Sequence, residues 1–100
     1  MTSAFAFKLS AAVETESWRQ LGNLPKPFLR TSGHLLIFDI KKYVVKKIAD
    51  PLQAHEIDIL LNGEALGDEL SLNFIKATRW IGGDSKESDD LALTYRKKLD

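Results

Sequence analysis

The amino-acid sequence predicts an α+β fold in which a mixed sheet of four to five strands packs on one main helix. Three stretches alternate with the period of a half-buried strand, one has the apolar spacing of an amphipathic helix, and Asn62-Gly63 marks a tight hairpin turn. The chain has 100 residues, of which 44% are hydrophobic and 28% charged. This size and balance suit a single globular domain over residues 1–100.

The first predicted strand lies near the N-terminus, where the residues from Phe5 to Leu9 alternate between apolar side chains and smaller or charged ones. A long loop is expected at about 10–26, because glycine and proline interrupt a polar run there. Trp18 and Leu21 are expected to pin this loop to the core. A loop of this length usually folds over the core or carries function.

A second strand is predicted from Phe28 to Thr31, directly after Pro25 and Pro27. Proline has no N–H to donate to a neighbouring strand, so the prolines favour a position at the edge of the sheet.

The main helix is predicted over about 37–49, because apolar residues recur there at spacings of three, four and four. Asp50-Pro51 ends it. No Ser, Thr, Asp or Asn stands at an N-cap position, and Asp39 in the first turn is the only electrostatic help. The expected buried stripe consists of Ile37, Ile40, Val44 and Ile48. The lysines that fill much of the rest of the helix are Lys41, Lys42, Lys46 and Lys47.

The second half of the chain predicts a hairpin and a closing strand. The alternating stretch from Ile57 to Leu61 runs into Asn62-Gly63, a dipeptide suited to a turn with positive φ at both central residues, and 64–66 forms a short return strand. The stretch 70–75 supplies apolar anchors but is too irregular to assign. The last strand is predicted over 91–96, again from alternation.

This order of elements is that of a β-grasp roll, and "EIDILLNGEALGDELSLNFI" followed by "LALTYR" resembles the second half of ubiquitin-like domains. Together with "PFLRTSG", "IFDIKKYVVKKI" and "TRW", these segments resemble the RAWUL domain, the C-terminal ubiquitin-like domain of Polycomb-type RING-finger ubiquitin ligases, with plant members the most similar. The resemblance covers about 24–97, and the loop at 10–26 has no counterpart.

The resemblance implies a non-catalytic protein–protein interaction module in the nucleus. RAWUL domains bind segments of Polycomb-group or transcription-regulator proteins, often through β-structure added to the sheet. The RING finger, which recruits the conjugating enzyme in such ligases, is not part of this sequence.

The best candidate for partner binding is the predicted edge strand, whose unpaired backbone groups an extended peptide can complete. Phe28 or Leu29 would fill or form a pocket, and Arg30 would bind a carboxylate. The alternative is that both apolar residues belong to the core and the proline-rich loop covers the edge. The candidate residues of this strand are Phe28, Leu29, Arg30 and Thr31.

Three further residues are candidates for partner contact. Lys42 and Lys46 could meet an acidic partner, but a solvated outer face of the helix is the preferred explanation. Trp80 either anchors a partner or caps the core beneath the final loop.

Composition argues against other classes of function. With two histidines and no cysteine, the chain lacks the parts of common nucleophile–base and zinc sites, so no catalytic, cofactor or metal residues are expected. Fourteen basic and fourteen acidic residues cancel, which argues against nucleic-acid binding, and no membrane segment is expected. The absence of cysteine fits a reducing compartment.

Two rival functions and one variant of the first remain open: a conjugatable ubiquitin-like modifier, a small nucleic-acid-binding domain, and a homodimer formed through the same edge. A modifier needs a diglycine after its last strand. Gly82-Gly83 instead precedes the predicted closing strand, so cleavage there would remove core residues.

Overall fold

The computed structural model describes residues 5–78 and 91–98. Within these ranges five strands form one mixed sheet in the order β2-β1-β5-β3-β4, with β1 and β5 parallel and the other neighbours antiparallel. The strands are β1 (Phe5–Ala11), β2 (Phe28–Thr31), β3 (Ile57–Leu61), β4 (Glu64–Ala65) and β5 (Leu91–Lys97). The helices are η1 (Ser17–Arg19), α1 (Ile37–Lys47), η2 (Ala54–Glu56) and α2 (Leu72–Thr78).

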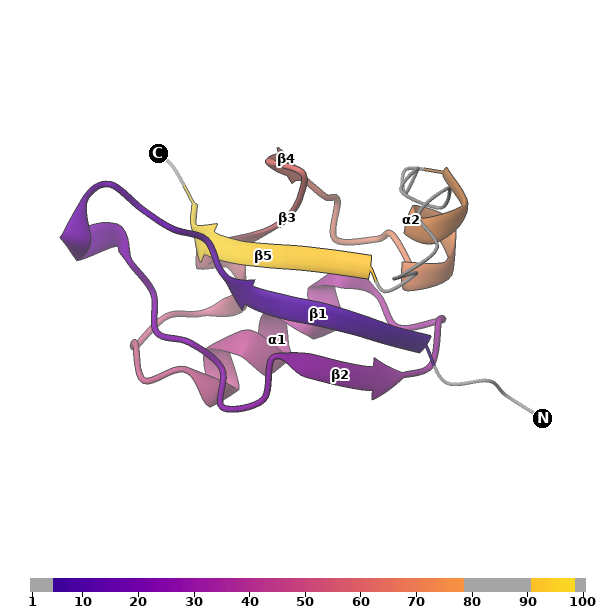
Figure 1. Ribbon diagram of the computed structural model, residues 1–100, viewed down its shortest axis with the longest axis horizontal. Helices are drawn as coiled ribbons and strands as arrows, with labels where there is room; N and C mark the ends of the chain where they lie inside the picture. Colours follow the sequence, from indigo (N-terminus) through magenta and orange to yellow (C-terminus); the bar gives the residue numbers. More distant parts are fainter. Residues whose placement is uncertain (1–4, 79–90, 99–100) are drawn as a thin grey trace.

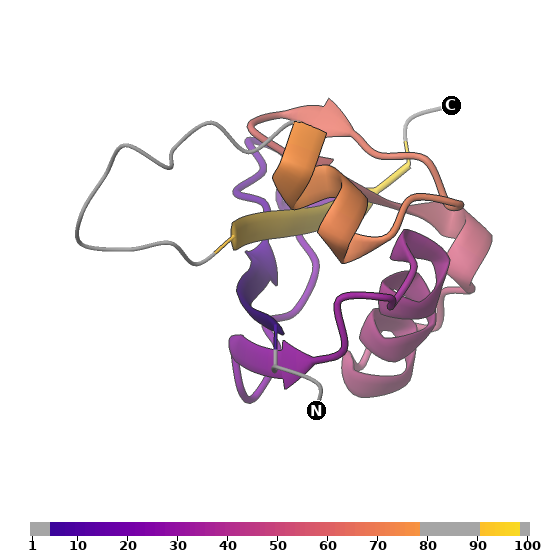
Figure 2. The same ribbon diagram turned by 90° about the vertical axis from the view of Figure 1, so that its right-hand side faces the viewer.

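The main helix, α1, packs behind the sheet in the view of Figure 1. In the side view of Figure 2, α1 lies on one side of β1 and β2, and no described helix covers their other side. The predicted α+β class, a mixed sheet on one main helix, is confirmed.

The core forms between α1 and the inner faces of the strands. Alternate residues of β1, β3 and β5 point inward, and the predicted apolar stripe of α1 meets them, so both periodicities are confirmed. The twelve most completely buried side chains are Phe7, Leu9, Ile37, Ile40, Val44, Ile57, Ile59, Leu72, Ile75, Leu91, Leu93 and Tyr95.

The hairpin turn between β3 and β4 has the predicted backbone. Asn62 and Gly63 both have positive φ, at 53° and 84°. Two central residues with positive φ match the right-handed twist of the flanking strands, which explains why this dipeptide predicted the turn.

Two elements differ from the prediction. The stretch 70–75, too irregular to assign, leads into and overlaps α2, a helix of seven residues that buries only Leu72 and Ile75. Two buried positions are too few to show a helical period in the sequence. In addition, β1 continues to Ala11, so the loop predicted from residue 10 begins two residues later.

The N-terminus of α1 is capped by the chain around residues 68–70. The N–H of Ile37 donates to the Leu70 carbonyl at 2.8 Å, and the N–H of Phe38 donates to the Asp68 carbonyl at 3.1 Å. Asp39 accepts the N–H of the preceding N-cap residue at 3.2 Å. These bonds satisfy donors that a helix normally leaves free, so no capping side chain at the N-cap position is needed.

Lys41 lies outside the predicted buried stripe of α1, and yet it is buried. It is 3% exposed, and its Nζ lies 2.6 Å from Asp68 Oδ1. A charge is tolerated in such a position only when it is paired. The ion pair ties α1 to the turn before α2.

The segment 12–27 folds back along the end of the sheet. Leu21 is buried, and the Tyr95 hydroxyl donates to the Gly22 carbonyl at 2.6 Å. Burial raises the pKa of the Tyr95 phenol above its ordinary value. Leu21 therefore pins the segment as expected, whereas Trp18 remains 66% exposed.

Candidate partner-binding site

Among the described residues, no strand pairs with the outer edge of β2. The Leu9 N–H donates to the Pro27 carbonyl at 2.7 Å, so Leu9 and Pro27 stand at a hydrogen-bonded position of the β1–β2 ladder, although proline returns no bond. By the alternation of an antiparallel ladder, Leu29 and Thr31 also bond to β1, while Phe28 and Arg30 direct their N–H and C=O groups outward. Within residues 5–78 and 91–98, no backbone group forms a hydrogen bond with these outward groups.

The side chains of β2 divide between the two faces of the sheet. Leu29 and Thr31 face α1 and are half-buried. Phe28 and Arg30 lie on the opposite face, where Phe28 is 66% exposed and thus outside the core. The Lys8 ammonium lies 5.9 Å from the centroid of the Phe28 ring. If a partner strand paired with β2, its alternate side chains would therefore contact opposite faces of the sheet.

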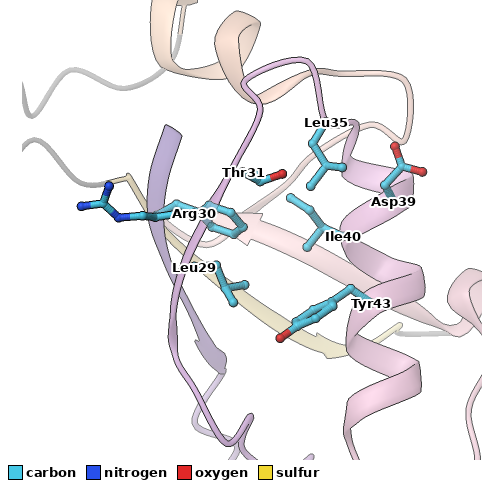
Figure 3. A pocket seen from close by; sticks show the side chains of 8 residues that line it. Leu29, Arg30, Thr31, Leu35, Asp39, Ile40 and Tyr43 are labelled. Atoms are coloured by element: carbon cyan, nitrogen blue, oxygen red, sulfur yellow. The ribbon is translucent and has the colours of Figure 1, made fainter. Parts of the chain in front are cut away.

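A groove of about 250 Å³ lies between β2 and α1. In Figure 3 the side chains of Leu29, Leu35 and Tyr43 converge on it, and Arg30 points to the other face of the sheet. The Asp39 carboxylate stands on its rim. The β2–α1 groove is thus an apolar slot with one acidic group at its border, directly beside the unpaired edge.

Two residues of this groove were missed by sequence reasoning. Tyr43 follows the buried Ile40 by three positions on α1, so it lies beside the apolar stripe of the helix. This spacing was the signal in the sequence from which its position near the groove could have been predicted. Leu35 comes from the turn before the helix, and the sequence holds no signal that places it against β2.

The other predicted contact residues are not part of the groove. Lys42 and Lys46 are exposed on α1 and are absent from the groove lining. Lys42 Nζ lies 3.6 Å from Asp39 Oδ1. Trp80 lies outside the described residues.

Within the described parts of the chain, no group of three or more His, Asp or Glu side chains is placed to bind a metal ion. None of the helices in those parts is both long and apolar enough to cross a membrane.

Comparison with known proteins agrees with this architecture. The RAWUL domain, described as RING finger- and WD40-associated ubiquitin-like, matches residues 27–96. Polycomb group RING finger protein 3 of Homo sapiens, and likewise that of Mus musculus, is 32% identical over 93 residues, covering 93% of this chain.

The chain spans 36% of the length of these relatives. The expected closeness to plant members stays a prediction. With a β-grasp sheet on one main helix, and with the family match over most of its length, the chain belongs to the RAWUL family of ubiquitin-like domains and is related to Polycomb group RING finger proteins.

Proposed function

We propose that this chain is a non-catalytic protein–protein interaction module of a Polycomb-like RING-type ubiquitin-ligase assembly in the nucleus. It binds an extended segment of a Polycomb-group or transcription-regulator protein as an additional strand on β2. The observation that carries this proposal is the unpaired backbone of Phe28 and Arg30 beside an apolar groove.

Strand addition explains both affinity and specificity at this edge. The partner's main chain completes the hydrogen bonds of Phe28 and Arg30. Side chains that point toward α1 enter the β2–α1 groove, whose volume and lining favour an aliphatic residue of the partner. Side chains on the other face meet Arg30, which forms charge-assisted bonds with a carboxylate.

The opposite edge of the sheet, formed by β4, is less suited to pairing with a partner strand. β4 contains only two residues, Glu64 and Ala65, and both are exposed. A short edge strand is one way in which proteins discourage pairing with another chain. β2 is twice as long and lies next to a groove, so we assign partner binding to β2.

The rival functions have less support. β5 follows Gly82-Gly83 in the sequence and is the central strand, so cleavage at the glycine pair would remove the middle of the sheet. For nucleic-acid binding, the zero net charge offers no general attraction to phosphate. A homodimer through β2 uses the same edge and is a variant of the proposal.

The test is a proline scan of the edge. Arg30→Pro removes an outward N–H and blocks an added strand, while the bonds to β1 remain. Val13→Pro places the same ring in an exposed loop and is the matched control. We expect proteins captured from nuclear extract by the wild type to be lost with Arg30→Pro and kept with Val13→Pro.

Amide hydrogen exchange then locates the contact. In a purified complex, the amides of Phe28 and Arg30 should become protected, and light scattering of the chain alone shows whether it forms a homodimer. Capture that survives Arg30→Pro, with no protection at these two amides, would refute binding at this edge.

A further inference from the structure

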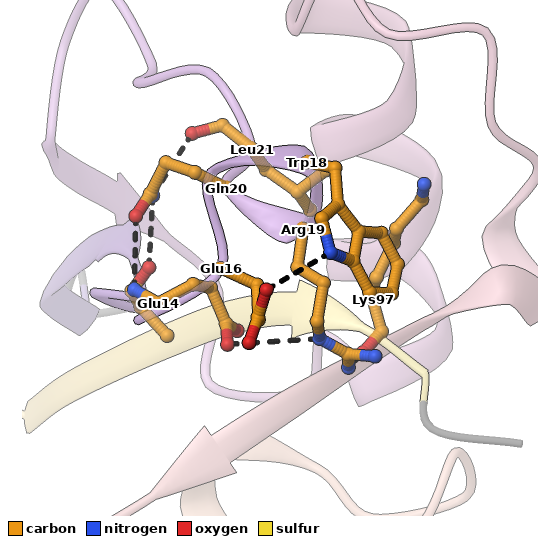
Figure 4. A network of polar contacts seen from close by, with 8 residues as sticks. Glu14, Glu16, Trp18, Arg19, Gln20, Leu21 and Lys97 are labelled. Carbon is orange, nitrogen blue, oxygen red and sulfur yellow. Dashed lines mark hydrogen bonds and ion pairs between the residues drawn. The ribbon is translucent and has the colours of Figure 1, made fainter.

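The exposed indole of Trp18 is held in one orientation. Its Nε1–H donates to Glu16 Oε1 at 3.2 Å, the Arg19 guanidinium carbon lies 5.3 Å from the ring centroid, and Lys97 Nζ lies 6.0 Å from it (Figure 4). Two-thirds of Trp18 nevertheless faces solvent. An aromatic side chain that is ordered but uncovered is typical of the centre of a binding surface.

The turn that presents Trp18 is braced against the sheet. Gln20 Nε2 donates to the Ala12 carbonyl at 2.9 Å, and Gln20 Oε1 accepts the Glu14 N–H at 2.9 Å. One Arg19 guanidinium nitrogen donates to the Lys97 carbonyl at 3.2 Å, which joins η1 to β5. A partner would therefore meet a surface that is already ordered, which lowers the entropic cost of binding.

A cleft of about 450 Å³ adjoins this indole. Trp18 and Leu52 supply its apolar part, and its basic groups come from Arg19, His55, Lys97 and Lys98.

Among the side chains that line this Trp18 cleft, Arg19, Lys97 and Lys98 are cationic and Glu56 is anionic. Glu14 lies 3.8 Å from the Arg19 side chain and offsets its charge. The carboxylate of Glu56, which also lines the cleft, accepts the backbone N–H of Gln53 at 2.8 Å. Lys97 and Lys98 form no ion pair with any residue of 5–78 or 91–98. The ammonium groups of Lys97 and Lys98 are therefore the cations of the cleft that lack an ion-pair partner among the described residues, and they lie beside an apolar surface.

We propose that the Trp18 cleft is a second protein-binding site, which takes an acidic peptide segment carrying an apolar side chain. The apolar side chain packs on Trp18 and Leu52, and neighbouring carboxylates bind the ammonium groups of Lys97 and Lys98. Nucleic acid fits less well, because its binding relies on contacts to several phosphates, and one of the three cationic side chains of the cleft, Arg19, is already paired with Glu14.

This second site is separate from the β2 edge. In Figure 1 the chain that follows β1 extends beyond the C-terminal end of this strand before it returns to β2, whereas β2 runs along the side of β1. The element η1, which contains Trp18, belongs to this connecting segment. Trp18 and Arg19 also precede the residues 27–96 that match the family. Both sites can be occupied together, and the acidic segment need not belong to the partner that pairs with β2.

The test measures fluorescence anisotropy with a labelled nonapeptide that has one phenylalanine flanked by glutamates. We expect saturable binding, weakened at least about tenfold by Trp18→Ala and by the double change Lys97→Gln with Lys98→Gln. Lys26→Gln, an exposed lysine elsewhere, should bind like the wild type. Urea denaturation checks that each variant folds.

Control ligands separate the remaining outcomes. Replacing the glutamates with glutamine, or the phenylalanine with alanine, should weaken binding, and single-stranded DNA of eight nucleotides should bind less tightly than the peptide. In nuclear magnetic resonance spectra, the indole N–H signal of Trp18 should shift on adding the peptide. Tighter binding of DNA, or peptide binding unaffected by both variants, overturns the proposal. Arg30→Pro should not change peptide binding, so this result is independent of the β2 edge.

Discussion

The β2 edge and the Trp18 cleft offer a partner different kinds of contact. At β2 the binding groups are the main-chain N–H and C=O of Phe28 and Arg30, which any extended segment can satisfy. At the cleft they are the side chains of Trp18, Lys97 and Lys98, which demand a particular partner chemistry. β2 lies within the family match, whereas Trp18 lies outside it. The β2 edge is therefore suited to the main chain of many extended segments, whereas the Trp18 cleft selects by side-chain chemistry.

The largest expected effect tests which backbone groups of β2 face outward. Leu29→Pro removes an N–H that bonds to β1, so we expect unfolding to become easier by about 3 kcal/mol or more. Arg30→Pro removes an outward N–H and should cost less than about 1 kcal/mol. Urea denaturation measures both values. If the two prolines destabilise equally, the assigned β1–β2 hydrogen-bonding pattern is wrong.

The next largest effect compares two side chains of the segment 12–27: Leu21, which anchors the segment to the core, and Trp18, which is exposed to solvent. Leu21 is 5% exposed, so Leu21→Ala should lower the free energy of unfolding by about 2–3 kcal/mol through a lost core contact. Trp18→Ala should change it by no more than about 0.5 kcal/mol, because that side chain is largely exposed. Chemical denaturation of the two variants compares them. A large loss from Trp18→Ala would mean that the indole is structural.

A smaller effect concerns the hydrogen bond between Tyr95 of β5 and Gly22 in the segment 12–27. Tyr95→Phe removes the hydrogen bond to the Gly22 carbonyl and should cost about 1 kcal/mol. It should also raise the mobility of the Trp18 turn, visible as faster amide exchange at residue 22 and its neighbours.

Tyr95 also predicts a pH dependence. Burial, with a smaller contribution from the Asp50 carboxylate, raises the phenol's pKa above 10.0. The unfolded chain releases this proton near pH 10.0 while the folded chain keeps it, so the stabilisation is complete below that pH and is lost as pH rises through the folded pKa. Denaturation at increasing alkaline pH should show a shallower decline for Tyr95→Phe than for the wild type. Equal slopes would contradict the assignment.

The smallest expected effect is that of Gln20→Ala. Gln20 is exposed, and loss of its bonds to Ala12 and Glu14 should cost about 0.5–1 kcal/mol. Because these bonds order the turn, peptide binding at the Trp18 cleft should weaken while capture through β2 is unchanged. Anisotropy and pull-down measurements on one preparation check this contrast; equal weakening of both would show that the two sites are coupled.

Much of the fold could be predicted because its signals are local. Alternation revealed β1, β3 and β5, the stripe on α1 marked its buried face, and two prolines indicated that β2 is an edge strand. The seven-residue α2 was missed because it buries only two side chains.

The candidate sites were less predictable. The unpaired edge of β2 follows from a local signal, but Tyr43 reaches the groove only through the packing of α1 on the sheet. Trp18 was expected to help pin the loop, since large apolar residues are usually buried. Only the docking of η1 on β5 places its indole in solvent between Arg19 and Lys97.

The sequence by itself determined the period and order of the elements, because burial of one face repeats every two residues in a strand and every three to four in a helix. Tertiary structure decided how α1 begins, since the carbonyls of Asp68 and Leu70 cap it, and it decided that Lys41 is buried against Asp68. These contacts join residues roughly thirty positions apart in the chain. No local pattern encodes them, because a hydrogen bond or an ion pair depends on where the folded chain places its second partner.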